Sequence, residues 1–117
     1  MPAGRMRRVD EAVREVLGDA ISRDLKDPRV GFVTVTAVKT SRDLRHARVY
    51  VSVLGDEPTR AATLQGLRSA HGFLQAAISR ELKLKHTPTL VFEYDETVER
   101  AARVTELIDH GPDLDQP

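Results

Sequence analysis

The sequence predicts an α+β fold of two layers, in which helices pack on one face of a three-stranded sheet. Two patterns support this prediction. Three short segments are rich in alternating β-branched residues, and the longer segments before and between them carry apolar residues every three or four positions. The predicted order is α-β-β-α-α-β, followed by one more helix. A chain of 117 residues is long enough for one domain of this kind.

The first helix is predicted over roughly residues 6–25, where apolar residues recur with helical spacing. Pro28 should end it, because the residue before a proline is disfavoured in the helical conformation. Two alternating runs, 32–38 and 47–53, with a short polar link between them, predict an antiparallel hairpin. The face of the second run that should meet the helices carries Ala47, Val49, Val51 and Val53. Its other face, with Arg48 and Tyr50, is expected to be solvated.

Two helices are predicted between residues 58 and 84, because their apolar stripe is interrupted at Ala70-His71-Gly72. We expect a bend there, with Gly72 letting the helices approach each other without an intervening Cβ. Residues 90–94 predict the third strand. Among the aromatic residues, Phe32 and Phe92 are expected in the core.

The end of the chain differs from its body. Asp95 is expected to cap a last helix over residues 96–108. The acidic segment 109–117 is expected to be a flexible tail. Residues 5–95 should therefore form the domain proper.

The formal net charge is zero, from 18 basic and 18 acidic residues, and the sequence pI is near 6.9. The total conceals a strong asymmetry. Residues 1–92 hold 16 basic and 10 acidic residues, an excess of six positive charges, whereas residues 93–117 hold 2 basic and 8 acidic residues. A basic body of this kind is compatible with nucleic-acid binding, although the overall charge is not.

Several classes of function are disfavoured by missing residue types and spacings. There is no cysteine, and the four histidines (46, 71, 86 and 110) include no pair with the spacing of a helical zinc site. Neither a phosphate-binding glycine loop nor a nucleophile elbow occurs. The carboxylates from Asp95 to Glu99 are explained by a helix N-terminus. We therefore expect no enzyme, no metal and no cofactor. Since no signal or membrane segment is seen, we expect a cytoplasmic protein.

Binding of RNA is better supported. Arginine outnumbers lysine 14 to 4, and its planar guanidinium suits phosphates and base edges. Tyr50 is the one aromatic residue expected to offer a stacking surface. The candidate RNA-binding residues are Arg5, Arg7, Arg8, Lys39, Arg42, Arg45, Arg48, Tyr50, His71, Arg80, Lys83 and Lys85. The alternative for each of them alone is an ordinary solvated surface residue.

The predicted order with a bend between consecutive helices resembles the type II KH domain. That module holds single-stranded nucleic acid with a Gly-x-x-Gly loop, which this chain lacks; Ala70-His71-Gly72 stands in its place. The chain resembles the ribosome-binding factor A family over about residues 5–108. The stretches that carry this resemblance are Asp27-Pro28-Arg29-x-Gly31-x-Val33-Thr34-Val35-Thr36, Ser41-x-Asp43-Leu44, Ala47-x-Val49-Tyr50-Val51-Ser52-Val53-Leu54-Gly55, Gly72-Phe73-Leu74 and Pro88-x-Leu90-x-Phe92-x-Tyr94-Asp95.

The resemblance implies a factor without catalytic activity that binds the free 30S ribosomal subunit and its precursor 16S rRNA. It implies assistance to late subunit maturation, including processing of the rRNA 5′ end, and a link to cold adaptation. Implied partners are 16S rRNA, nearby ribosomal proteins and a ribosome-dependent GTPase that promotes release. The protein would act as a monomer. The alternatives are a general single-stranded RNA-binding KH module and a protein-interaction module.

Overall fold

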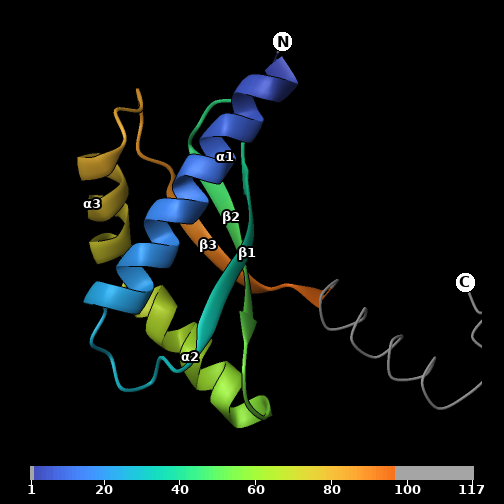
Figure 1. Ribbon diagram of the computed structural model, residues 1–117, viewed down its shortest axis with the longest axis vertical. Coiled ribbons are helices and arrows are strands. Elements are labelled where there is room, and N and C mark those ends of the chain that lie inside the picture. The colour runs from blue at the N-terminus through green and yellow to red at the C-terminus, as the bar shows by residue number, and fades with distance from the viewer. Residues whose placement is uncertain (1, 97–117) are drawn as a thin grey trace, which may run out of the picture.

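The computed structural model describes residues 2–96. Apart from Glu96, the helix predicted for 96–108 and the tail of 109–117 lie outside this range. The described elements are α1 (Pro2–Asp19), the π-helical turn η1 (Ala20–Asp24), β1 (Val33–Thr40), β2 (His46–Val53), α2 (Glu57–Ser69), α3 (His71–Glu81) and β3 (Thr89–Tyr94). The predicted order α-β-β-α-α-β is confirmed (Figure 1).

The sheet has the strand order β1-β2-β3. Its first two strands are antiparallel, while β3 runs parallel to β2. A parallel neighbour cannot follow through a tight turn, so the chain needs a crossover, which α2 and α3 supply. Helices α1, α2 and α3 all pack on one face of the sheet. The two-layer architecture follows, and no segment among residues 2–96 covers the other face of the sheet, which we call the uncovered face.

The core lies between the helices and the covered face of the sheet. Its central strand contributes Ala47, Val49 and Val51, all fully buried as their alternation predicts. Phe92 of β3 is buried, as expected from the sequence. The helices contribute the largest remaining side chains, Val13, Leu17, Leu67, Leu74 and Ile78.

Phe32 is a correction to the sequence prediction, because its side chain is 79% exposed. It lies just before β1, where its carbonyl accepts a hydrogen bond from the backbone N–H of Leu54 at 3.1 Å. Since side chains alternate along an extended chain and Val33 faces the helices, Phe32 faces the other way. Leu54, its partner across the hairpin, is 73% exposed for the same reason.

A β-bulge at Thr36 interrupts the alternation of β1. Val35 pairs with Val51 and Ala37 with Tyr50, so Thr36 is the extra residue. Its hydroxyl donates to the Tyr50 carbonyl at 3.2 Å or to the Asp95 carboxylate at 2.5 Å. After the bulge the faces exchange, so that Val38 is buried. Lys39 is thereby turned to the uncovered face.

The first helix differs from its prediction in where it begins and in the form of its last turn. It begins at Pro2, earlier than expected, and its last turn, Ala20–Asp24, is a π-helix. The wider turn closes with the Leu25 N–H donating to the Ala20 carbonyl at 3.0 Å. Leu25 is already extended, which confirms that the helix ends before Pro28.

The predicted bend between the two helices is formed by one residue, Ala70. Ala70 stands between α2 and α3 with φ −92° and ψ 10°, and its N–H is shared between the carbonyls of Gly66 and Leu67. The role expected for Gly72 is wrong, because a Cβ added there would meet no atom within 4 Å. The close approach lies in the preceding helix, α2. A Cβ on Gly66 would stand 2.8 Å from Cγ2 of Val30.

Replacing Gly72 with alanine is therefore expected to stabilise the protein by about 0.5 kcal/mol, because alanine loses less backbone entropy in a helix. Urea unfolding of G72A against the parent protein measures this. A clear loss of stability would mean that the bend does depend on a glycine at this position.

The segment that meets Gly66 is held by a local ion pair. Arg29 donates to the Asp27 carboxylate through its side chain at 2.7 Å and through its backbone N–H at 2.9 Å. These two contacts, in that order of importance, lower the pKa of Asp27 to about 2. On the other side, the hydroxyl of the fully buried Thr63 lies 3.2 Å from the Arg29 carbonyl.

A pH dependence follows from the Asp27 carboxyl. Because its pKa is lower in the folded protein than its usual value near 3.8, the stabilisation is present above that value and is lost as the pH falls toward 2. NMR titration of the side-chain carboxyl carbon should give a pKa near 2. R29A should return it toward 3.8, whereas K26A, a neighbouring cation, should leave it unchanged. A pKa unchanged in R29A would contradict the ion pair.

Candidate nucleic-acid interface

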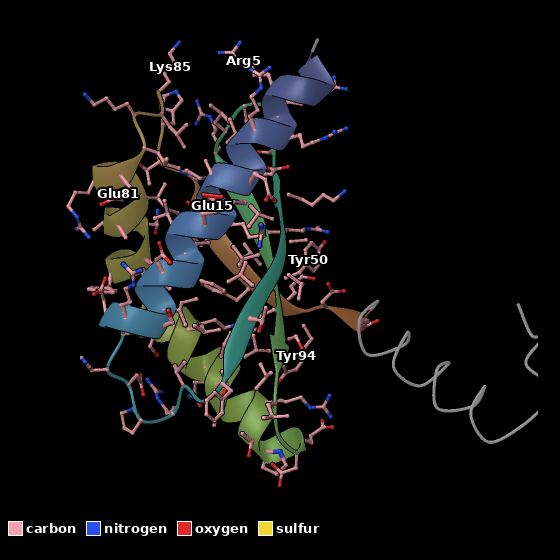
Figure 2. All side chains as sticks on the ribbon, in the orientation of Figure 1. Arg5, Glu15, Tyr50, Glu81, Lys85 and Tyr94 are labelled. Carbon is pink, nitrogen blue, oxygen red and sulfur yellow. The ribbon has the colours of Figure 1, made fainter. Side chains whose placement is uncertain are left out.

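Seven of the twelve candidate residues gather at one end of the molecule, which we call the basic end. They come from three separate segments: the start of α1, the link between β1 and β2, and the connection from α3 to β3. All seven are exposed, and Arg5 and Lys85 mark this end in Figure 2. The members are Arg5, Arg7, Arg8, Arg42, Arg45, Lys83 and Lys85.

Two hydrogen bonds bring the three segments together. The Asp10 carboxylate of α1 accepts from the backbone N–H of Thr40 at 2.9 Å, which fixes the start of α1 beside the end of β1. The Arg45 carbonyl accepts from the N–H of Thr89 at 2.8 Å, which fixes the link beside the start of β3. These contacts place the three segments of the basic end next to one another.

The β1–β2 link has a defined shape. The Asp43 carboxylate accepts from the Ser41 hydroxyl at 2.7 Å and from the Arg45 backbone N–H at 3.1 Å. The Ser41 hydroxyl contributes most to lowering the pKa of Asp43, followed by the Arg45 N–H. The backbone of Leu44 is in the left-handed conformation, with φ 62°, which residues other than glycine rarely adopt. This closed link holds Arg42 and Arg45 outward.

The start of α1 is electrostatically unfavourable for its own helix. Its first turn has no acidic residue, and three arginines follow within two turns. Each cation near the positive end of a helix dipole costs about 0.3–1 kcal/mol. A bound phosphate would relieve this repulsion and would also accept from the free N–H groups of the helix.

Lys39, Arg48 and Tyr50 lie on the uncovered face of the sheet. Lys39 and Arg48 are paired across β1 and β2, close to the basic end. Arg48 lies 3.8 Å from the Glu93 carboxylate. The Tyr50 hydroxyl and then Glu93 raise the pKa of Arg48. A phosphate would have to compete with Glu93 for this guanidinium.

Two candidates stand apart from the rest. Arg80 lines a groove between α1 and α3, described below. His71 follows the bend, where its Nδ1 lies 3.0 Å from the Arg68 carbonyl. Because a carbonyl can only accept, Nδ1 carries the proton. His71 thus has a capping contact at the end of α2, and the residue is exposed.

Sequence reasoning missed two residues at the basic end. His46 begins β2 beside the link, and His86 follows Lys85; both are exposed. Their spacing only argues against a metal site, but their nearness in sequence to Arg45 and Lys85 indicates that they belong to the same surface. Across residues 2–96, no three His, Asp or Glu side chains are grouped to hold a metal. In the same range no helix has the length and apolar character needed to cross a membrane.

The α-β-β-α-α-β order, the mixed sheet and the one-residue bend define a type II KH-like domain that lacks the Gly-x-x-Gly loop. A family model described as Ribosome-binding factor A matches residues 5–108. Ribosome-binding factor A from Halothermothrix orenii is 44% identical over 108 residues, which cover 92% of this chain and 88% of the relative. The chain belongs to the ribosome-binding factor A family.

Solved structures agree with this assignment. The crystal structure of ribosome-binding factor A from Thermus thermophilus is similar with a TM-score of 0.68 and 30% identity, covering 76% of this chain and 94% of that one. A homology model of the Thermus thermophilus factor, fitted into the cryo-EM map of its complex with the 30S subunit, is similar with a TM-score of 0.62 and 30% identity. That comparison covers 74% of this chain and 91% of the other.

Proposed function

We propose that this protein is an assembly factor that binds the free 30S ribosomal subunit through phosphates of 16S rRNA. The observation that carries the proposal is the basic end, where the fold brings seven exposed cations from three segments together. Family membership supports it, as does the complex of the Thermus thermophilus relative with the 30S subunit. The domain that performs this role would be residues 5–95.

The contacts would be distributed over the rRNA backbone. Arg5, Arg7, Arg8, Arg42, Arg45, Lys83 and Lys85 would bind phosphates, with Lys39 and Arg48 extending the surface onto the sheet and Tyr50 available for stacking. Arg80 and His71 would contact RNA only at the margins, because they lie away from this end. Without a Gly-x-x-Gly loop, structured rRNA fits this surface better than a free single strand does.

The role would be non-catalytic and would need no cofactor. The factor would assist late 30S maturation and processing of the 16S rRNA 5′ end, in the cytoplasm, with a link to cold adaptation. It would act as a monomer beside neighbouring ribosomal proteins, and a ribosome-dependent GTPase would promote its release.

Co-sedimentation tests the proposal. The full chain is mixed with purified 30S or 50S subunits and centrifuged through sucrose at low and physiological salt. We expect recovery with 30S subunits and a linear fall of log K with log salt concentration. Recovery with 50S subunits, or with neither, would refute the proposal. Tight binding to short single-stranded oligonucleotides, without 30S binding, would support a general KH module instead.

A further inference from the structure

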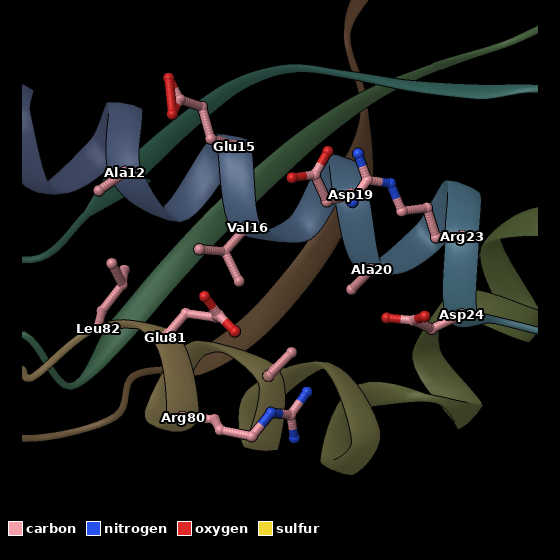
Figure 3. A pocket seen from close by; sticks show the side chains of 11 residues that line it. Ala12, Glu15, Val16, Asp19, Ala20, Arg23, Asp24, Arg80, Glu81 and Leu82 are labelled. Carbon is pink, nitrogen blue, oxygen red and sulfur yellow. The ribbon is translucent and has the colours of Figure 1, made fainter.

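A groove separates α1 and its π-helical turn from α3, on the side of the helices away from the sheet. Its volume is about 400 Å³, and Figure 3 shows the side chains that line it. The floor is apolar: Val16 is half-buried, and Ala20 and Ala77 are only 3% exposed. The fold itself creates this hollow, because alanines stand where larger side chains would fill the space between the helices.

The rim of the groove is charged and mainly acidic. It carries four exposed carboxylates and two guanidinium groups, a formal excess of two negative charges. In Figure 3, the carboxylates of Asp24 and Glu81 point into the opening from opposite sides. The four carboxylates are those of Glu15, Asp19, Asp24 and Glu81. Among the described residues, Glu15 interacts electrostatically with Arg14, whereas Asp19, Asp24 and Glu81 form no ion pair with another side chain.

We propose that this groove binds a basic segment of a partner protein, with a lysine side chain laid along its floor. The aliphatic stem of such a side chain would cover Val16 and Ala20, while its charged end would reach Asp24 and Glu81. The chemistry favours a protein over RNA, because phosphates would be repelled by the carboxylates. The groove borders the basic end where its lining residue Leu82 precedes Lys83, and its acidic rim distinguishes the two surfaces.

The identity of the protein that supplies this basic segment rests on the proposed function. If the protein binds the 30S subunit, the basic segment belongs to a ribosomal protein near its site. The binding chemistry of the groove itself does not depend on that function, and the two are tested separately.

The groove is first tested with an isolated peptide. The ¹⁵N-labelled full chain is titrated with a ten-residue peptide of alternating lysine and alanine. We expect amide shifts concentrated in residues 15–24 and 77–82. In D24N/E81Q, two charge-assisted contacts are lost, and the dissociation constant should rise about ten-fold.

The matched control is E57Q/E96Q, which removes the same charge from two exposed carboxylates outside the groove. This variant should bind the peptide as the parent does. Shifts spread over the whole surface, or equal weakening in both variants, would overturn the proposal. All four substitutions are at exposed positions, and the amide spectrum reports directly whether each variant is folded.

A second experiment addresses the partner. Zero-length carbodiimide coupling, which joins carboxylates to lysine amines, is applied to the protein bound to 30S subunits. We expect peptides containing Asp24 or Glu81 joined to a lysine of a ribosomal protein, and loss of that product in D24N/E81Q with 30S binding retained. Normal 30S binding without this product would show that the basic segment does not belong to a ribosomal protein. It would leave the peptide binding of the groove unaffected. Absence of 30S binding refutes the proposed function. The peptide titration then shows on its own whether the groove binds a basic segment.

Discussion

Reversing two charges at the basic end, in R42E/K85E, is expected to reduce 30S affinity about 100-fold. Each of these residues belongs to a different segment of the basic end, and neither makes an ion pair with a described residue that would have to be broken first. Loss of two charge-assisted phosphate contacts, at about 1.5 kcal/mol each, accounts for the expected decrease. The slope of log K against log salt should fall in magnitude by about 1.4–1.8. Quantitative co-sedimentation over a salt series measures both.

The control compares K26E with K85E, since each single variant changes the net charge by the same amount. Lys26 is exposed, and it follows α1 at the end of the helix opposite to Arg5. We expect K26E to keep most of the affinity and the salt slope, whereas K85E alone should lose about ten-fold in affinity. If both variants weaken binding equally, the protein responds to net charge alone and the basic end is not its interface.

Replacing Gly66 with leucine is expected to destabilise the protein by about 3 kcal/mol. Even a Cβ at this position would stand 2.8 Å from Cγ2 of Val30 and 3.4 Å from Cβ of Arg29. The larger side chain must therefore push the 27–30 segment away from α2, which costs overpacking energy and the contact between Thr63 and the Arg29 carbonyl. Urea unfolding followed by circular dichroism gives the change in the free energy of unfolding.

G72L provides the matched comparison, since the same side chain is added to a glycine in the neighbouring helix where a Cβ meets nothing within 4 Å. Its free energy of unfolding should equal or slightly exceed that of the parent. Equal destabilisation by the two substitutions would show that helix propensity, and not the approach of the 27–30 segment, decides the effect.

Local patterns were sufficient for most of the fold. The period of two in 47–53 and the helical spacing on both sides of the bend each depend on neighbours a few residues apart. For this reason the element order, the buried face of β2 and the end of the first helix were all predicted correctly. Phe32 was misjudged, although the same alternation that buries Val33 and Val35 already turns it outward.

The sequence alone determined the element order, the covered face of β2 and the positive excess of residues 1–92, since these depend on composition and short periods. Tertiary structure decided which helical glycine is tightly packed and how the basic residues gather. Asp10 meets Thr40 from 30 positions away, and Thr36 meets Asp95 from 59 positions away. The bulge at Thr36 turns Lys39 outward by exchanging the faces of β1. Such contacts join distant parts of the chain, so no pattern within a short window can reveal them.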